Sequence, residues 1–206
     1  MKNVKLLLNM GLLLGVSVLF TACPGGDDIE PSPNIPSNIN DPSKEGTNYN
    51  GHDYVDLGLS VYWAACNIGA TTPSEQGTKY KFSELYKKNI SYTEYSSISI
   101  VELLWGGDWR LPLFSEIEEL VDKCKWSDKI VNGVEVLVAT GPNGKSIYFP
   151  YTSYVYNQGY IGVYWSGERN VQHPLKAYAL AFNTTDIYAT ENDADYAALV
   201  RPVIHK

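Results

Sequence analysis

Cysteine, histidine and charged residues are all scarce in this 206-residue chain, which has three cysteines, three histidines and 19% charged residues. The patterns GxSxG, HExxH, GxGxxG and the phosphate-binding GxxxxGK[ST] are absent, so the common signatures of hydrolases, zinc proteases and nucleotide-binding enzymes are missing. His52, His173 and His205 have no second ligand at helical or turn spacing, which argues against zinc. We therefore expect no enzyme activity and no cofactor.

Basic residues are outnumbered by acidic ones, 16 against 23, and the formal net charge is −7. Removal of an N-terminal leader with its two lysines would make the charge −9. Such a surface repels nucleic acids and anionic lipid headgroups, so we expect neither as a partner. Tyrosine, with 16 copies, is abundant instead, and it suits both half-buried strands and contact surfaces.

The only long apolar run lies at the N-terminus, where Lys2 and Lys5 precede an apolar stretch over 6–20. A basic start with a short apolar core predicts a secretory signal over 1–22, because the run is too short for a comfortable membrane span. Small residues just before Cys23 resemble the lipobox of bacterial lipoproteins. This resemblance implies that Cys23 carries a lipid and anchors the chain to a membrane. The alternative is an ordinary cleaved signal.

Residues 23–50 are rich in Pro, Ser, Asn, Asp and Gly and hold almost no large apolar side chains, which predicts a lipidated, disordered tether. Two acids shortly after Cys23 are similar to the surface-export signal of Bacteroidetes lipoproteins. We expect an outer-membrane lipoprotein that faces the exterior. A generic acidic tether on a periplasmic protein remains the alternative.

An amphipathic helix is the strongest local prediction, in the string WGGDWRLPLFSEIEELVDKC over 105–124. Ser115 and Glu118 have the spacing of a capping box. The apolar residues that follow at helical spacing form one face, and Glu116 lies on the predicted solvent face. The apolar set is Ile117, Leu120, Val121 and Cys124, and the opposite face also holds Glu119, Asp122 and Lys123.

The rest of 51–206 reads as one domain made mostly of strands. Apolar or alternating runs predict strands at 54–59, 61–66, 134–139, 146–149, 162–166, 177–182 and 197–204, with Trp63 in the core and a helical turn at 100–104. The sequence GPNG at 141–144 predicts the turn of a hairpin. The Tyr-rich region 80–95 allows no assignment. The fold class expected is α+β, with a mixed, mostly antiparallel sheet, one capped helix and long loops.

Five blocks in order resemble one family, the Fibrobacter succinogenes major paralogous domain, which belongs to the C-type-lectin-like superfamily. They span about 50–204 and are VDLGLSVYWAACNIGA (55–70), WGGDWRLP (105–112), TGPNGKSIYFP (140–150), YWS (164–166) and VRPV (200–203). The resemblance implies a C-type-lectin-like fold. Formylglycine-generating enzymes of the superfamily need a cysteine pair near the C-terminus, and no cysteine follows Cys124, so that activity is excluded.

Cys66 and Cys124 are the two cysteines that remain once Cys23 is lipidated. An oxidising envelope would allow a disulfide between them. The alternative is two buried thiols that pack as small apolar groups. Spacing along the chain does not decide between the two.

Calcium-binding strings of C-type lectins, EPN, QPD and WND, are absent. Glu191, Asn192, Asp193 and Asp195 nevertheless offer clustered oxygen atoms of the kind calcium prefers. A polar loop before the last strand explains the same residues, and we expect no metal.

The positive signal for binding is aromatic. No residue over 146–167 is charged, and Tyr151, Tyr154, Tyr156 and Tyr160 lie there among Ser, Asn, Gln and Gly. Rigid rings with adaptable polar neighbours are typical of recognition surfaces. The alternative is that these tyrosines pack a long loop onto the sheet. Arg169 is expected to extend the same face.

These patterns favour a non-enzymatic surface lipoprotein whose domain binds a glycan or a protein ligand through loops between about 150 and 195. A structural or accessory subunit of an envelope protein complex is the second hypothesis, in which the aromatic face docks a partner protein.

Overall fold

The computed structural model describes residues 47–91, 94–155 and 159–206. The predicted signal, Cys23 and nearly all of the tether lie outside the described residues, so those assignments stay predictions. The last residues of the predicted disordered tether, Thr47–Tyr49, form a strand instead, because they pair with the strand that follows them. In the described part of the chain, no helix is both long and apolar enough to cross a membrane.

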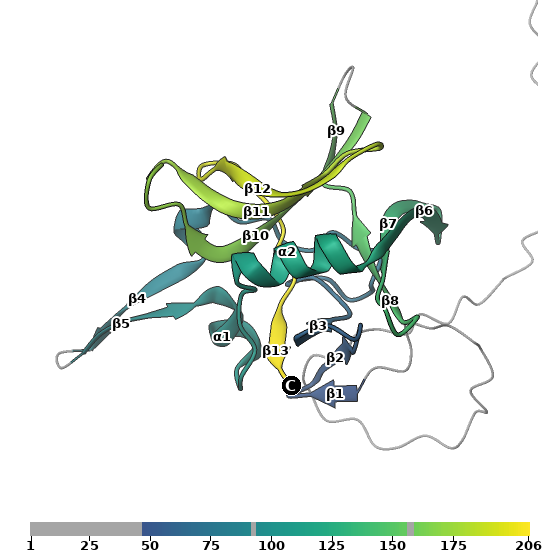
Figure 1. Ribbon diagram of the computed structural model, residues 1–206. Coiled ribbons are helices and arrows are strands. Elements are labelled where there is room, and N and C mark those ends of the chain that lie inside the picture. Colours follow the sequence, from purple (N-terminus) through teal and green to yellow (C-terminus); the bar gives the residue numbers. More distant parts are fainter. Residues whose placement is uncertain (1–46, 92–93, 156–158) are drawn as a thin grey trace, which may run out of the picture.

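The described strands form four antiparallel sheets (Figure 1). The first sheet has the order β1 (Thr47–Tyr49), β2 (His52–Val55), β3 (Val61–Ala64) and β13 (Val203–His205). The second has the order β12 (Ile187–Asp193), β11 (Lys176–Phe182), β10 (Gly159–Arg169) and β9 (Ser153–Val155). The third is β6 (Lys125–Val131), β7 (Val134–Thr140) and β8 (Ser146–Pro150), and the fourth pairs β4 (Tyr86–Ser91) with β5 (Glu94–Ser99).

Helices are few: a 3₁₀ turn η1 (Phe82–Glu84), α1 (Ile100–Trp105) and α2 (Phe114–Lys123) complete the described elements. The expectation of a β-rich, mostly antiparallel α+β fold is confirmed at this level. All the described strand pairs are antiparallel. The one parallel pairing among the described residues is an isolated bridge between Tyr164 and Leu199.

Most predicted strands lie close to where the sequence placed them, and the GPNG turn joins β7 to β8. The Gly144 N–H donates to the Gly141 carbonyl at 2.9 Å, and Gly144 has φ +84°, which is why glycine suits this position. The run 197–204 is only partly strand, because Ala198 and Leu199 form isolated bridges before β13 begins. Strands β1, β4, β5, β6, β9 and β12 were not predicted.

Helix α2 lies where the sequence placed it, but its N-terminal cap differs. Leu113 is the N-cap residue, and its N–H donates to Glu116 Oε2 at 2.8 Å. Arg110 binds the same carboxylate through both terminal nitrogens, so Glu116 is buried rather than facing solvent. The predicted Ser115–Glu118 capping box is wrong because Ser115 already lies within the first turn. Ile117 and Leu120 are buried, as predicted.

Two packed clusters of apolar side chains make the core. In the first, Trp63 and Phe149 pack with α2, which lies between the upper and lower sheets of Figure 1. In the second, Trp109 and Trp165 pack beneath α1 and η1. Both of these indoles find an acceptor: Trp165 Nε1 donates to the carbonyl of Tyr80 at 2.8 Å and Trp109 Nε1 to that of Tyr49 at 3.0 Å.

A buried arginine links these layers. Arg201 is 1% exposed, and its guanidinium donates to the carbonyls of Ala64 (3.0 Å), Ala65 (2.9 Å) and Tyr148 (2.7 Å). Its Nε donates to Asn67 Oδ1 at 2.7 Å. Burial lowers the pKa of Arg201 to about 10, so the group stays charged at neutral pH. Carbonyl and amide oxygens, rather than a carboxylate, satisfy this charge.

Cys66 and Cys124 both pack in the first cluster, yet Cys124 is a free, buried thiol. The proposed Cys66–Cys124 disulfide is therefore not formed, and the alternative of a thiol packed as a small apolar group holds for Cys124. Cys124 follows α2 directly, where its side chain completes the buried face of Ile117 and Leu120. Burial raises the pKa of the Cys124 thiol to about 11.

Replacing Arg201 tests its role in the core. We expect Arg201→Met to lower the free energy of unfolding by about 3–5 kcal/mol, because four oxygen acceptors would be left buried without a donor. Lys123→Met, on the exposed side of α2, should change stability by less than about 0.5 kcal/mol. Chemical denaturation measures both. Equal stability of the two variants would contradict the assignment.

Alkylation tests the state of Cys124. Without reductant at pH 8, we expect iodoacetamide to leave Cys124 unmodified in the folded protein, since the thiol is buried and protonated. In denaturant the same residue should react fully, which peptide mass analysis detects. A peptide linking Cys66 to Cys124, or rapid reaction in the folded state, would be the contrary result.

Candidate binding groove

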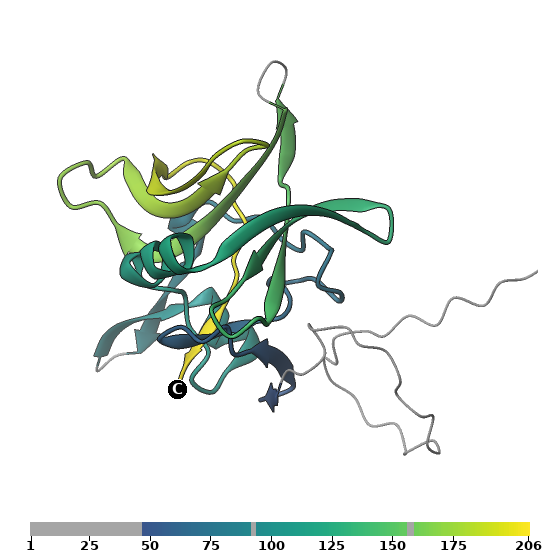
Figure 2. The ribbon, with the colours of Figure 1, turned by 45° about the vertical axis from the view of Figure 1, so that its right-hand side comes forward.

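An open groove of about 550 Å³ lies between the tip of the β6–β7 hairpin and the start of the β9–β10 hairpin. Figure 2 shows these two hairpins on the same side of the molecule. The first wall comes from the β6–β7 hairpin, where Ile130 and Val134 expose 68% and 43% of their surface. Gly133 and Glu135 complete this wall. Ile130 is paired directly with Glu135, so an exposed aliphatic side chain stands beside a carboxylate, while Val134 is paired with Val131.

Tyrosines form the opposite wall and the floor. Tyr154 is 63% exposed and Tyr160 41%, and they stand directly opposite each other on β9 and β10. Their ring centroids are 5.3 Å apart, with planes inclined by 71°. Tyr151, only 6% exposed, lies below, with its ring centroid 5.7 Å from that of Tyr160. Ser153 lines the groove beside them.

The floor is held in place by a hydrogen bond across the groove. The Tyr151 hydroxyl donates to Asp128 Oδ1 on β6 at 2.5 Å. Burial, this hydrogen bond, and the negative charges of Asp128 and Glu135 raise the pKa of Tyr151 above its ordinary value. The two hairpins are therefore linked through a neutral phenol at the base of the groove.

A loop before η1 supports the same floor. Gln76 Nε2 donates to the carbonyl of Tyr151 and Lys79 Nζ to that of Thr152, each at 2.6 Å. Asn67, buried beneath the loop, in turn donates to the carbonyl of Gln76 at 2.9 Å. Asn67 is also the residue that accepts from Arg201, so the groove floor is connected to the buried arginine.

The structure brings together three of the four predicted tyrosines, Tyr151, Tyr154 and Tyr160. Tyr156 lies outside the described residues. Tyr151 is not displayed as a contact ring but forms the floor, where its hydroxyl donates to Asp128. Each of the two alternatives, packing and recognition, therefore holds for part of the set: Tyr151 packs against the domain, whereas Tyr154 and Tyr160 are exposed.

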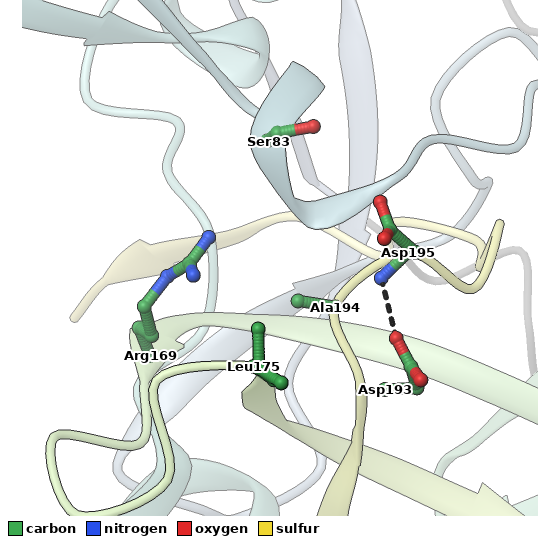
Figure 3. A pocket seen from close by; sticks show the side chains of 6 residues that line it. All are labelled: Ser83, Arg169, Leu175, Asp193, Ala194 and Asp195. Carbon is green, nitrogen blue, oxygen red and sulfur yellow. Dashed lines mark hydrogen bonds between the residues drawn. The ribbon is translucent and has the colours of Figure 1, made fainter.

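Arg169 does not extend this face, so that expectation is wrong. It ends β10 at the far end from Tyr160, roughly 25–30 Å along an extended strand. There it lines a separate pocket of about 170 Å³ with Ser83, Leu175 and the Asp193–Asp195 segment (Figure 3). Its guanidinium donates to the Pro174 carbonyl and lies 5.2 Å from the centre of the Phe82 ring.

The weak calcium candidates are engaged with the protein itself. The Glu191 carboxylate accepts from Lys176 Nζ (2.6 Å) and Asn170 Nδ2 (2.5 Å) and meets His173 Nδ1 at 2.9 Å. The hydrogen bonds from Lys176 and His173 lower the pKa of Glu191 to about 2. Asp193 Oδ1 accepts the N–H of Asp195, as Figure 3 shows. No group of three or more His, Cys, Asp or Glu side chains in the described ranges is arranged to hold a metal ion.

Sequence reasoning missed the whole first wall of the groove. Ile130, Val134 and Glu135 lie on strands separated by Asn132 and Gly133, both with positive φ, at 52° and 80°. An Asn-Gly pair between two β-branched runs is a strong signal for a tight hairpin turn. The pair was present in the sequence and would have placed Ile130 opposite Glu135 at a hairpin tip.

Comparison of the chain with family models, with curated proteins and with solved structures found no match.

Raising the pH tests the floor of the groove. The pKa of Tyr151 is raised in the folded state, while an unfolded tyrosine ionises near pH 10. Its contribution to stability is therefore complete below about pH 10 and lost as the pH rises further. We expect the free energy of unfolding to fall less steeply between pH 9.5 and 11 in Tyr151→Phe than in the wild type.

Denaturation series at stepped pH measure this slope. Tyr151→Phe should also cost about 1 kcal/mol at neutral pH, because Asp128 loses its donor. Tyr154→Phe, which changes an exposed ring, should keep the wild-type slope. Identical slopes in the wild type and Tyr151→Phe would show that the phenol is not buried against Asp128.

Proposed function

We propose that this chain is a non-enzymatic binding module whose groove takes a glycan or protein ligand. The observation that carries the proposal is the display of Tyr154 and Tyr160 in solvent, in a groove that exposed Ile130 and Val134 also line. Large exposed apolar side chains gathered in one place, rather than scattered singly, are typical of interaction sites.

The physical properties of the two rings support recognition. Tyr154 and Tyr160 brace each other edge to face, so binding would immobilise little that is not already ordered. Their hydroxyls have no hydrogen-bond partner among the described residues and can bond a ligand. Aromatic faces with polar edges suit both the C–H faces of a sugar ring and the side chains of a protein.

We also propose a C-type-lectin-like fold and membership of the Fibrobacter succinogenes major paralogous domain family. The roles of the five similar blocks support this. Trp109 and Arg110 of WGGDWRLP, Trp165 of YWS and Arg201 of VRPV fill or join the core instead of lining the groove. Blocks of this kind specify the core of a fold. The residues that line the groove can then differ between proteins that share the fold.

The proposed location is the outer membrane, through a lipid on Cys23 and a tether over 23–50. β1, which forms the end of that segment, lies near the C-terminus and away from β9 in Figure 1. A chain anchored through that tether would present the groove on the side away from its attachment. Such a presentation suits a surface-exposed binding module.

An accessory subunit of an envelope complex remains a second candidate. Ile130, with 68% of its surface exposed, favours it, because an exposed aliphatic side chain at a hairpin tip suits a protein partner better than a sugar. In that case the groove would dock the partner, and mild crosslinking followed by purification would recover one defined protein.

Removing the displayed rings tests the proposed function. We expect Tyr154→Ala and Tyr160→Ala each to weaken ligand binding at least tenfold on glycan arrays or in adhesion to intact cells, since each removes a contact ring. Tyr188→Ala is the matched control, because Tyr188 is 48% exposed but does not line the groove. Equal binding by wild type and both groove variants would refute the assignment.

A further inference from the structure

The groove has one sign of charge. Of the described residues that line it, only Glu135 is charged, and no lysine, arginine or histidine is among them. Glu135 is exposed on β7, at the rim of the aliphatic wall. A carboxylate in this position favours a cationic ligand and disfavours an anionic one.

The floor adds to the negative potential. Asp128 reaches the base of the groove through its hydrogen bond with Tyr151, and the charges of both Asp128 and Glu135 act on that phenol. Two carboxylates from adjacent strands β6 and β7 therefore act at one end of the cavity. Lys79 places one ammonium group under the floor, where its Nζ donates to the Thr152 carbonyl, and the two carboxylates outnumber it.

The rings are arranged to receive a cation as well as a sugar. Tyr154 and Tyr160 are nearly perpendicular, and Tyr160 is inclined by 44° to Tyr151. Three tyrosine rings and a carboxylate line one space, and the negative face of an exposed tyrosine ring attracts an ammonium group. The same rings offer flat apolar surface to the C–H groups of a pyranose ring.

We propose that the groove binds a glycan built from amino sugars with a free amine. The pyranose rings stack on Tyr154 and Tyr160, and Glu135 holds the ammonium group. This inference rests on the proposed function and names its ligand class. Polar Gln76 and Ser153 line the groove for the sugar hydroxyls, and its volume of about 550 Å³ is of a size that takes a small oligosaccharide. A lysine side chain of a protein ligand would contact Glu135 but would have no sugar ring to stack on the tyrosines.

A pair of oligosaccharides with the same backbone tests the inference. The glucosamine hexamer carries free amines, and the N-acetylglucosamine hexamer has each amine neutralised by an acetyl group. Calorimetry at pH 5.5 keeps the amines of the glucosamine hexamer protonated. We expect the wild type to bind the glucosamine hexamer at least tenfold more tightly than its acetylated counterpart.

Matched variants separate the groove from the overall charge. Glu135→Gln should reduce the preference for the free amine to less than about threefold, whereas Glu118→Gln, which removes the same charge from the exposed side of α2, should leave it unchanged. Tyr154→Ala should weaken binding of both hexamers. An equal loss in Glu118→Gln and Glu135→Gln would reduce the preference to a bulk charge effect and overturn the inference.

The outcomes also distinguish this inference from the proposed function. Equal or tighter binding of the acetylated hexamer refutes the selection for an amine but leaves a tyrosine-dependent binding site. If neither hexamer binds, the inference fails, and the glycan array with the Tyr154 and Tyr160 variants decides the proposed function separately. Binding of oligolysine that depends on Glu135, with no binding of either sugar, would contradict a glycan ligand.

Discussion

A buried guanidinium that is satisfied by backbone and amide oxygens is the interaction on which the rest of this structure depends. Arg201 donates to oxygens from β3, from the segment after it and from β8, which are far apart in the sequence. Its planar group also lies 5.1 Å from the centre of the Phe149 ring. A buried charge is costly unless every donor finds an acceptor. The chain can therefore satisfy Arg201 only when these segments meet in one arrangement.

The groove follows from that arrangement. β8 carries the Tyr148 carbonyl that Arg201 holds, and the hydroxyl of buried Tyr164 donates to the Pro150 carbonyl at the end of the same strand. Tyr151 comes next in the chain and turns inward to Asp128. Because the strand before it is fixed, the short hairpin after it can hold Tyr154 and Tyr160 in solvent without collapse onto the core.

Much of the framework could be predicted from the sequence, because apolar spacing reports burial directly. The buried face of α2, the β7–β8 hairpin and the core position of Trp63 all follow from such spacing. Strand β6 could not be found in this way, since KWSDKIV is mostly exposed and carries three charges on one edge of a sheet. The cap of α2 was misplaced because Arg110, outside the helix, positions Glu116.

The candidate site was predictable only in part. The tyrosine segment could be recognised because uncharged polar residues surround its rings. The sequence alone did not show which of these rings are buried and which are exposed. That division depends on Asp128, 23 positions earlier in the chain, which draws Tyr151 down. The prediction that Arg169 extends the tyrosine face was wrong for a simpler reason. Tyr160 and Arg169 lie at opposite ends of the long strand β10, so they are far apart.

Hydroxyl-radical footprinting of the folded protein tests the central claim most directly, namely that a rigid core displays two tyrosine rings at a groove. The account predicts rapid oxidation of Tyr154 and Tyr160 and slow oxidation of Tyr151 and Tyr164, which are 6% and 2% exposed. Slow oxidation of all four rings would mean that Tyr154 and Tyr160 are interior side chains, and the account would then be wrong.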